Sequence, residues 1–146
     1  MPRYGSVMKL AAALALVALV GCSDGRPERV PVSGKVLLDG KPLEFGSVQF
    51  LPESGRPAGG MILPDGSFQL TCYEHNDGAT LGKHLVSVTS AKALNPQQTQ
   101  WFAPKRYSEP GTSGIEVTVE EPIDDLVIEL EGENGQPFEP FIERLR

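Results

Sequence analysis

Apolar and polar side chains alternate at every second residue over most of the chain beyond residue 30, and this period constrains the fold more than any other feature. A period of two places alternate side chains on one face of a β-strand, whereas a helix needs a period of 3.6. No segment of useful length after residue 30 shows the helical period. The alternation predicts about seven strands, whose shared-face residues are Val32, Val36, Leu38, Val48, Phe50, Met61, Leu63, Phe68, Leu70, Cys72, Val86, Val88, Ile115, Val117, Val119, Leu126, Ile128 and Leu130.

Turn-forming sequences separate these segments at short intervals: DGKP (39–42), PDG (64–66), NDG (76–78) and LGK (81–83). Glycine takes a positive φ freely, and an Asp or Asn side chain bonds its own backbone, so these sequences favour tight turns. Parallel strands need crossovers of a dozen residues or more. The spacing therefore predicts an all-β fold, a seven-stranded antiparallel β-sandwich.

The first 22 residues have the pattern of an export signal. Arg3 and Lys9 precede an apolar run, 10–20, that is too short to span a bilayer as a mature helix. The sequence LVGC (19–22) resembles the lipobox of bacterial lipoproteins, which implies cleavage after residue 21 and acylation of Cys22. An uncleaved anchor is the alternative. Residues 1–21 are thus predicted to be a signal peptide and 22–29 a lipidated tether on a bacterial cell envelope, where Ser23 favours the outer membrane, facing the periplasm or the surface.

The mature chain would be strongly acidic. Two of the 13 Lys and Arg precede Cys22, so 11 remain against 19 Asp and Glu, a net charge of −8. An acidic surface repels phosphate backbones, which argues against nucleic-acid binding. The acids between Glu116 and Glu133 alternate with apolar residues, which favours a solvated sheet face over an ion site.

Lipidation of Cys22 would leave Cys72 without a disulfide partner. Cys72 shares one side of its strand with Phe68 and Leu70, so we expect a small buried core residue rather than a reactive thiol. The domain must then be stabilised by its core alone.

Three motifs resemble the transthyretin-like, or carboxypeptidase regulatory-like, β-sandwich of small bacterial envelope lipoproteins. They are SGKVLLDGKPLEFGSVQFLP (33–52), PDGSFQL (64–70) and LGKHLVSV (81–88), and PKRYSEPGTSG (104–114) is similar to a further segment of that group. The resemblance covers about residues 30–130 and implies a sandwich domain at 30–131, followed by a C-terminal tail at 132–146. Members of the wider family serve as modules beside enzymes or as surface-polymer binders, so the resemblance implies interaction rather than catalysis.

Catalytic readings of such folds depend on the histidines. His84 occupies the position of an aromatic residue in the family strand, and His75 precedes the NDG turn, so structural roles are expected for both. Related intradiol dioxygenases hold iron with two tyrosines and two histidines, which makes Tyr73, His75, His84 and Tyr107 the alternative, enzymatic set. The chain lacks the His-x-His pair of those dioxygenases and the C-terminal tail of the transthyretin-related hydrolases. It also lacks the spacing of Cys and His residues that a zinc site requires. We therefore predict no catalytic residue, no metal and no cofactor.

The longest stretch without strand periodicity, 91–113, is expected to be an irregular loop, and long loops are usually functional or mobile. Its aromatic and basic residues suggest either an exposed platform for a sugar or peptide or a plug that closes one end of the sandwich; pairing along a sheet edge is a third use. The predicted contact residues are Trp101, Phe102, Lys105, Arg106 and Tyr107. The predicted partners are the membrane, through Cys22, and an envelope protein or glycan.

Overall fold

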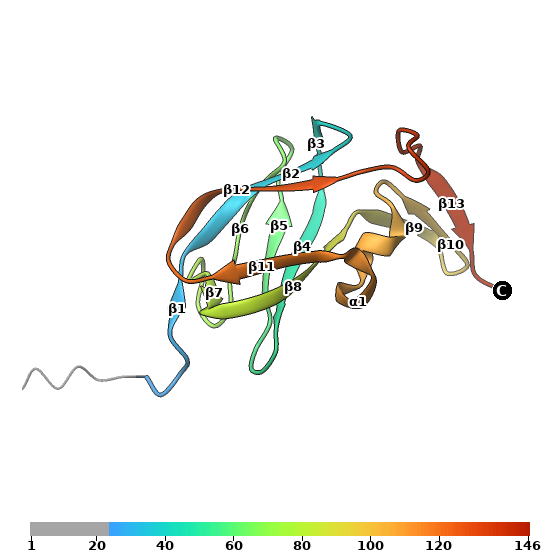
Figure 1. Ribbon diagram of the computed structural model, residues 1–146. Coiled ribbons are helices and arrows are strands. Elements are labelled where there is room, and N and C mark those ends of the chain that lie inside the picture. Colours follow the sequence, from blue (N-terminus) through green and yellow to red (C-terminus); the bar gives the residue numbers. More distant parts are fainter. Residues whose placement is uncertain (1–23) are drawn as a thin grey trace, which may run out of the picture.

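The computed structural model describes residues 24–146 (Figure 1). Cys22 and the predicted signal peptide lie outside these residues. The elements are β1 (Arg29–Val30), β2 (Val32–Leu38), β3 (Lys41–Pro42), β4 (Gly46–Pro52), β5 (Ala58–Ile62), β6 (Ser67–Gln69), β7 (Ala79–Thr80), β8 (Gly82–Thr89), β9 (Ala91–Asn95), β10 (Gln98–Trp101), η1 (Lys105–Ser108), α1 (Pro110–Ser113), β11 (Ile115–Val119), β12 (Ile123–Leu130) and β13 (Phe141–Arg144). The all-β prediction is confirmed, and the strands outnumber the seven expected.

The first sheet has the order β11-β8-β4-β5 and is antiparallel throughout. Val48 of β4 lies opposite Val88 of β8, and Phe50 lies opposite Val86. All four of these side chains are buried, whereas Gln49 between them faces solvent. The period of two in the sequence therefore corresponds to one buried and one exposed face.

The second sheet contains β12, β2 and β3, with β6 also paired to β2. Its pairing of β2 with β12 is parallel, with Val36 opposite Ile128 and Leu38 opposite Leu130, so the prediction of a purely antiparallel fold is wrong. The need for a long crossover is still met, because the whole first sheet lies between β2 and β12 in the chain.

The two sheets enclose one core, an arrangement consistent with a β-sandwich, and we call this unit the sandwich. On one side the sheets are bridged, because Gly59 of β5 exchanges backbone hydrogen bonds of 2.9 and 2.8 Å with Thr71. A Cβ at the neighbouring Gly60 would overlap the carbonyl oxygen of Gln69, so this close approach requires glycine. Cys72 is 3% exposed within the core, as predicted.

A third sheet, of order β13-β10-β9, projects from the end of the molecule opposite the N-terminal segment (Figure 1). We call it the distal sheet. It overturns one expectation, since residues 91–113 form a hairpin followed by η1 and α1 in place of an irregular loop, and β13 of this sheet lies in the predicted tail at 132–146. Asn95 shapes the hairpin turn, because its Oδ1 accepts the backbone N–H of Gln97 at 3.0 Å.

Asp39 holds the beginning of the C-terminal tail against the sandwich. Its carboxylate accepts the backbone N–H of Gly132 at 2.9 Å and that of Phe138 at 2.7 Å. These bonds, with Phe138 the larger cause, lower the pKa of Asp39. The residue predicted only as part of a turn thus also guides the tail towards β10.

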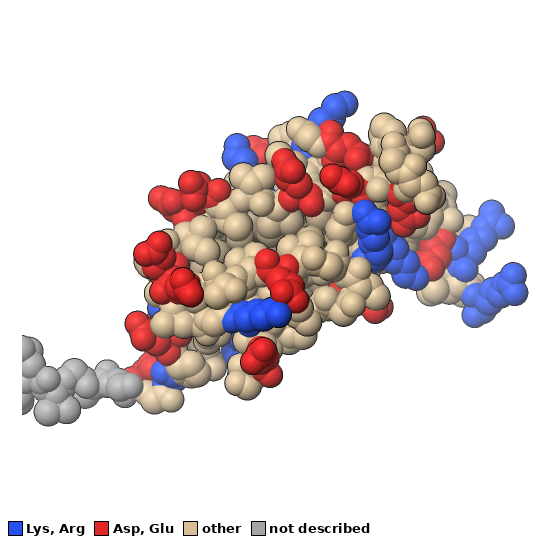
Figure 2. All heavy atoms as spheres, in the orientation of Figure 1, with Lys and Arg blue, Asp and Glu red and all other residues tan. Residues whose placement is uncertain are grey.

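The acidic residues between Glu116 and Glu133 are all exposed, as the sequence predicted, and Figure 2 shows acidic side chains spread over β11, β12 and the N-terminal end. Within residues 24–146, no helix has the length and apolar character needed to cross a membrane.

Candidate functional site

A groove of about 790 Å³ lies over the solvent-facing side of β8, β4 and β5. Its floor comes from the positions that alternate with the core: Ser87 and Thr89 of β8, Gln49 of β4 and Met61 of β5. Thr71, His75 and Asn76 approach from the segment after β6, and Ser108 approaches from η1. The complete lining is Ser47, Val48, Gln49, Gly59, Gly60, Met61, Leu63, Gln69, Thr71, His75, Asn76, Ser87, Thr89 and Ser108.

The groove contains no Lys, Arg, Asp or Glu, although charged residues are 22% of the chain. Hydroxyl and amide groups, which both donate and accept hydrogen bonds, supply its polarity. Met61 and Leu63 add apolar surface, since they are 70% and 55% exposed. Such a lining suits an uncharged ligand that carries many hydroxyl groups.

Gly59 keeps the middle of the groove open. It pairs with Gln49 on the solvent-facing side of the sheet, and an added Cβ would meet only the carbonyl oxygen of Val48, at an ordinary 3.5 Å. A larger side chain at Gly59 would therefore extend into the groove without displacing the backbone.

His75 is the one ionisable side chain of the groove. Its Nε2 lies 3.1 Å from Nδ2 of Asn76 and accepts a hydrogen bond from that amide. The backbone N–H of Asn76 donates in turn to Oγ1 of Thr71 at 3.0 Å. Among the described residues no carboxylate is bonded to His75, so the ring lacks the orienting acid of a catalytic triad.

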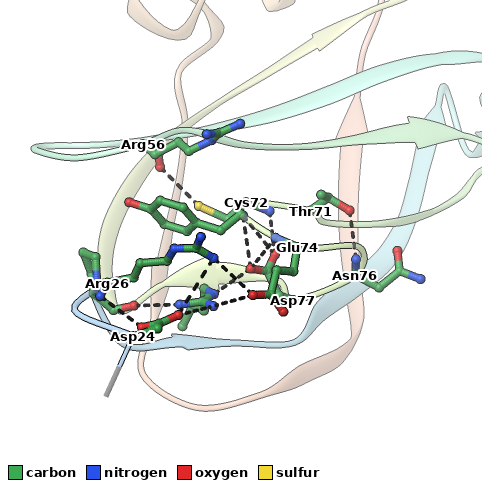
Figure 3. Close-up of polar contacts among 11 residues, drawn as sticks. Asp24, Arg26, Arg56, Thr71, Cys72, Glu74, Asn76 and Asp77 are labelled. Carbon is green, nitrogen blue, oxygen red and sulfur yellow. Dashed lines mark hydrogen bonds and ion pairs between the residues drawn. The ribbon is translucent and has the colours of Figure 1, made fainter. Parts of the chain in front are cut away.

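The loop that carries His75 is organised by Asp77 (Figure 3). The Asp77 carboxylate accepts the backbone N–H groups of Cys72 at 2.7 Å, Tyr73 at 3.1 Å and Glu74 at 2.9 Å, and it accepts Nε–H of Arg29 at 2.6 Å. Burial raises the pKa of Asp77, but these bonds outweigh burial and lower it to about 2. The ionised carboxylate thus fixes one wall of the groove and joins it to β1.

Three guanidinium groups surround the ring of Tyr73. The Cζ atoms of Arg26 and Arg29 lie 5.1 Å from the ring centroid, and that of Arg56 lies 5.4 Å away. Asp24, Glu74 and Asp77 pair with Arg26 and Arg29. This cluster closes the sandwich at the N-terminal end, and cation–π contacts account for the position of Tyr73.

The predicted contact residues on 91–113 do not form an exposed aromatic platform. Trp101 is 9% exposed, its Nε1 donates to Oε2 of Glu143 at 3.0 Å, and Nζ of Lys105 lies 5.7 Å from its ring. Tyr107 is 6% exposed and accepts the backbone N–H of Glu131 at 3.1 Å. Phe102 packs edge-on against Phe45 with ring centroids 4.9 Å apart, whereas Lys105 and Arg106 are exposed.

The alternative set of Tyr73, His75, His84 and Tyr107 does not come together. Tyr73 contacts Arg29 before β2, and Tyr107 bonds to Glu131 beyond the far end of β12, which runs parallel to β2. About 20 Å of strand separates these two places. Residues 24–146 also contain no group of three His, Cys, Asp or Glu that could hold a metal ion.

His84 is buried, with 1% exposure. Its Nδ1–H donates to the carbonyl of Gly82 at 3.0 Å, and its Nε2 lies 3.4 Å from Oγ1 of Thr80. Burial lowers the pKa of His84, so its ring is neutral at pH 7. Burial likewise raises the pKa of the Cys72 thiol, which disfavours the reactive thiolate.

Apart from His75, the sequence alone did not single out the groove residues. Their one signal was the set of small polar residues at the positions between Val48, Phe50, Val86 and Val88, which any solvated sheet face also shows. No family model, curated protein or solved structure matches the chain.

Proposed function

We propose that this chain is a lipid-anchored, non-catalytic binding module of a bacterial cell envelope, and that its groove holds an uncharged stretch of a glycan. The observation that carries the proposal is the uncharged lining of hydroxyls and amides within an otherwise acidic protein. A neutral ligand that is rich in hydroxyl groups can form hydrogen bonds with such a lining, and its binding does not depend on the negative charge of the surrounding protein.

A peptide would fit the same groove less well. Peptides often bind by adding a strand to a sheet edge, which uses unpaired backbone groups. The floor strand β4 is already paired with β5 on one side and β8 on the other, so its backbone is occupied. Recognition must therefore come from side chains, and these are the hydroxyl and amide groups of the groove.

The anchor rests on the lipobox-like sequence that ends at Cys22. Each buried lipid methylene contributes about 0.8 kcal/mol, so two or three acyl chains hold a small domain on a membrane. The proposal also takes the sandwich to be the seven-stranded, transthyretin-like type, with β2, β4, β5, β6, β8, β11 and β12 as its principal strands. Each of these overlaps one predicted segment.

Binding of the purified full-length chain to an array of neutral envelope oligosaccharides tests the groove. The Gly59→Trp variant should lose at least about tenfold in affinity, because an indole would fill the groove where the backbone tolerates it. Thr118→Trp, on the same sheet but outside the groove, is the matched control and should bind as the unmodified chain does. Equal binding by both variants, or no glycan retained by the unmodified chain, would refute the proposal.

Metabolic labelling with radioactive palmitate tests the anchor separately. Label should enter the chain and should be absent from a Cys22→Ser variant, which should also lose membrane attachment. Label that persists in Cys22→Ser would place the lipid elsewhere, and an unlabelled chain would contradict the anchor.

A further inference from the structure

Charge is segregated along the second half of the chain. Residues 107–142 contain ten Asp and Glu and no Lys or Arg. The distal sheet and η1 have the opposite character, with Lys92, Lys105, Arg106 and Arg144 against the single acid Glu143, and Arg146 follows β13. Figure 2 shows basic side chains grouped at the end of the molecule away from the N-terminal segment.

Most of these charges have no ion-pair partner within the described part of the chain. The carboxylates from Glu120 to Glu133 form no ion pair there, and neither do Arg144 and Arg146. Lys105 pairs with Glu143, and Lys83 pairs with Glu116. One acidic and one basic region are therefore left with unmatched charge.

Each region also contains a strand with an open edge. Among residues 24–146, β12 pairs only with β2, and β13 pairs only with β10. Exposed apolar side chains lie on both strands, since Val127 of β12 is 54% exposed and Ile142 of β13 is 52% exposed. An edge strand of this kind is a template for pairing with another strand.

The side-chain order on the two edges is complementary. Val127 is flanked at a spacing of two by Asp125 and Glu129, and Ile142 is followed at the same spacing by Arg144. When Val127 faces Ile142, Arg144 meets Asp125 in an antiparallel pairing and Glu129 in a parallel one. In either direction, the pairing of the two strands therefore combines one apolar contact with one ion pair.

We propose that two copies of this chain associate head to tail, with the β13 edge of one copy paired along the β12 edge of the next. Like charges oppose the symmetric pairing of β12 with β12, where Asp125 faces Glu129, whereas β13 paired with itself about Ile142 sets Arg144 opposite Pro140 and gains no ion pair, so the unlike edges match best. Such a contact uses two different surfaces and repeats, which yields open chains of molecules. Confinement to one membrane would raise the effective concentration and favour a contact of this small size.

Disulfide cross-linking between variants of the full-length chain tests the pairing. Ile142→Cys and Val127→Cys are mixed in detergent solution and oxidised with copper phenanthroline, which joins thiols only when their Cβ atoms approach to about 4 Å. The mixture should give a covalent dimer. Ile142→Cys mixed with Met61→Cys, at a position on another face that is 70% exposed against 54% for Val127, is the control and should give about tenfold less. The unmodified chain measures any background from Cys22 and Cys72.

Charge reversal then tests the ion pairs. Adding Arg144→Glu to the Ile142→Cys chain should reduce the cross-link to Val127→Cys about tenfold, and adding Asp125→Arg and Glu129→Arg to the latter should restore it. A dimer no stronger than the Met61 control, or one insensitive to Arg144→Glu, would overturn the proposal. The same cross-linking can be carried out in envelope membranes. If Ile142→Cys is joined there to a different protein and not to Val127→Cys, the β13 edge binds that protein, and the proposal is wrong. These cross-linking results do not depend on the palmitate label or on glycan binding, so a failure of the proposed function can be distinguished from a failure of this proposal.

Discussion

The sandwich and the distal sheet are both β-structures, but they bury their side chains differently. In the sandwich, Val36, Phe50 and Val86 are each 0% exposed between two sheets. In the distal sheet, Trp101 is the one large buried side chain, and Leu94 and Ile142 are 48% and 52% exposed. A sheet with a single covered face and two open edges has far less apolar burial to stabilise it. We infer that the sandwich unfolds as one cooperative unit and that the distal sheet opens at a lower free energy.

The largest expected effect comes from the centre of the sandwich. Phe50→Ala removes a fully buried ring that contacts the His84 ring at a centroid distance of 5.8 Å. We expect the free energy of unfolding to fall by about 3–5 kcal/mol, the usual cost of such a cavity. Urea unfolding followed by circular dichroism measures it. A loss below about 1 kcal/mol would contradict the inference that burial in this core stabilises the sandwich.

The same contrast in burial explains what the sequence predicted. All seven predicted strand segments form at least part of a strand, because their apolar residues repeat at every second position, and in six of them these residues lie in or against the core. In the segment at β5 the predicted face is wrong, since Met61 and Leu63 are exposed and Ile62 between them is buried. The hairpin β9–β10 was missed because ALNPQQTQ has almost no residue to bury, so its strands have no periodic signal. Its regularity comes instead from pairing with β13, about 40 residues later in the chain, which a local pattern does not record.

The groove and the parallel β2–β12 pair were missed for a similar reason. Each depends on which strands become neighbours, and the polar residues of a solvated face carry no information about that. Asp77 was identified as part of a turn, but its bonds to three consecutive backbone N–H groups and Arg29 follow only from the folded loop. Local chemistry therefore predicted the turns and the core, and tertiary pairing determined the site.

Asp77 should make the sandwich sensitive to acid. Its pKa of about 2 lies below the ordinary value near 3.8, so the unfolded chain binds more protons than the folded chain between these values. Its stabilisation of about 2–3 kcal/mol is complete above about pH 5 and is lost as the pH falls through 4 towards 2. Thermal melting of the unmodified chain and of Asp77→Asn across pH 2–7 measures this. The two melting temperatures should differ most at neutral pH and converge at low pH, and a constant difference would contradict the assignment.

Trp101→Ala separates the two regions directly. The substitution removes the ring that covers the distal sheet and its bond to Glu143, so we expect amide exchange in β9, β10 and β13 to accelerate by at least about a hundredfold. Unfolding of the sandwich should change by less than about 1 kcal/mol, because Trp101 lies outside the main core. Hydrogen exchange read by mass spectrometry distinguishes these effects, and Trp101→Phe is the conservative control. Equal loss of protection in both regions would show that they unfold together.

The smallest effect is expected at Glu143, which links Lys105 to Trp101. Its Oε1 lies 2.6 Å from Nζ of Lys105, and its Oε2 accepts the indole N–H, so these two bonds, with Lys105 the larger cause, lower the pKa of Glu143. The carboxylate therefore favours the closed distal sheet at neutral pH, and this contribution should fade as the pH falls below the ordinary glutamate range. Exchange rates in β10 and β13 should rise on acidification in the unmodified chain, after correction for intrinsic exchange, and should be less pH-dependent in Glu143→Gln. Asp77 acts on the sandwich, and Glu143 acts on the distal sheet. If Asp77→Asn changes the acid response of the sandwich alone, and Glu143→Gln that of the distal sheet alone, the two regions are stabilised independently.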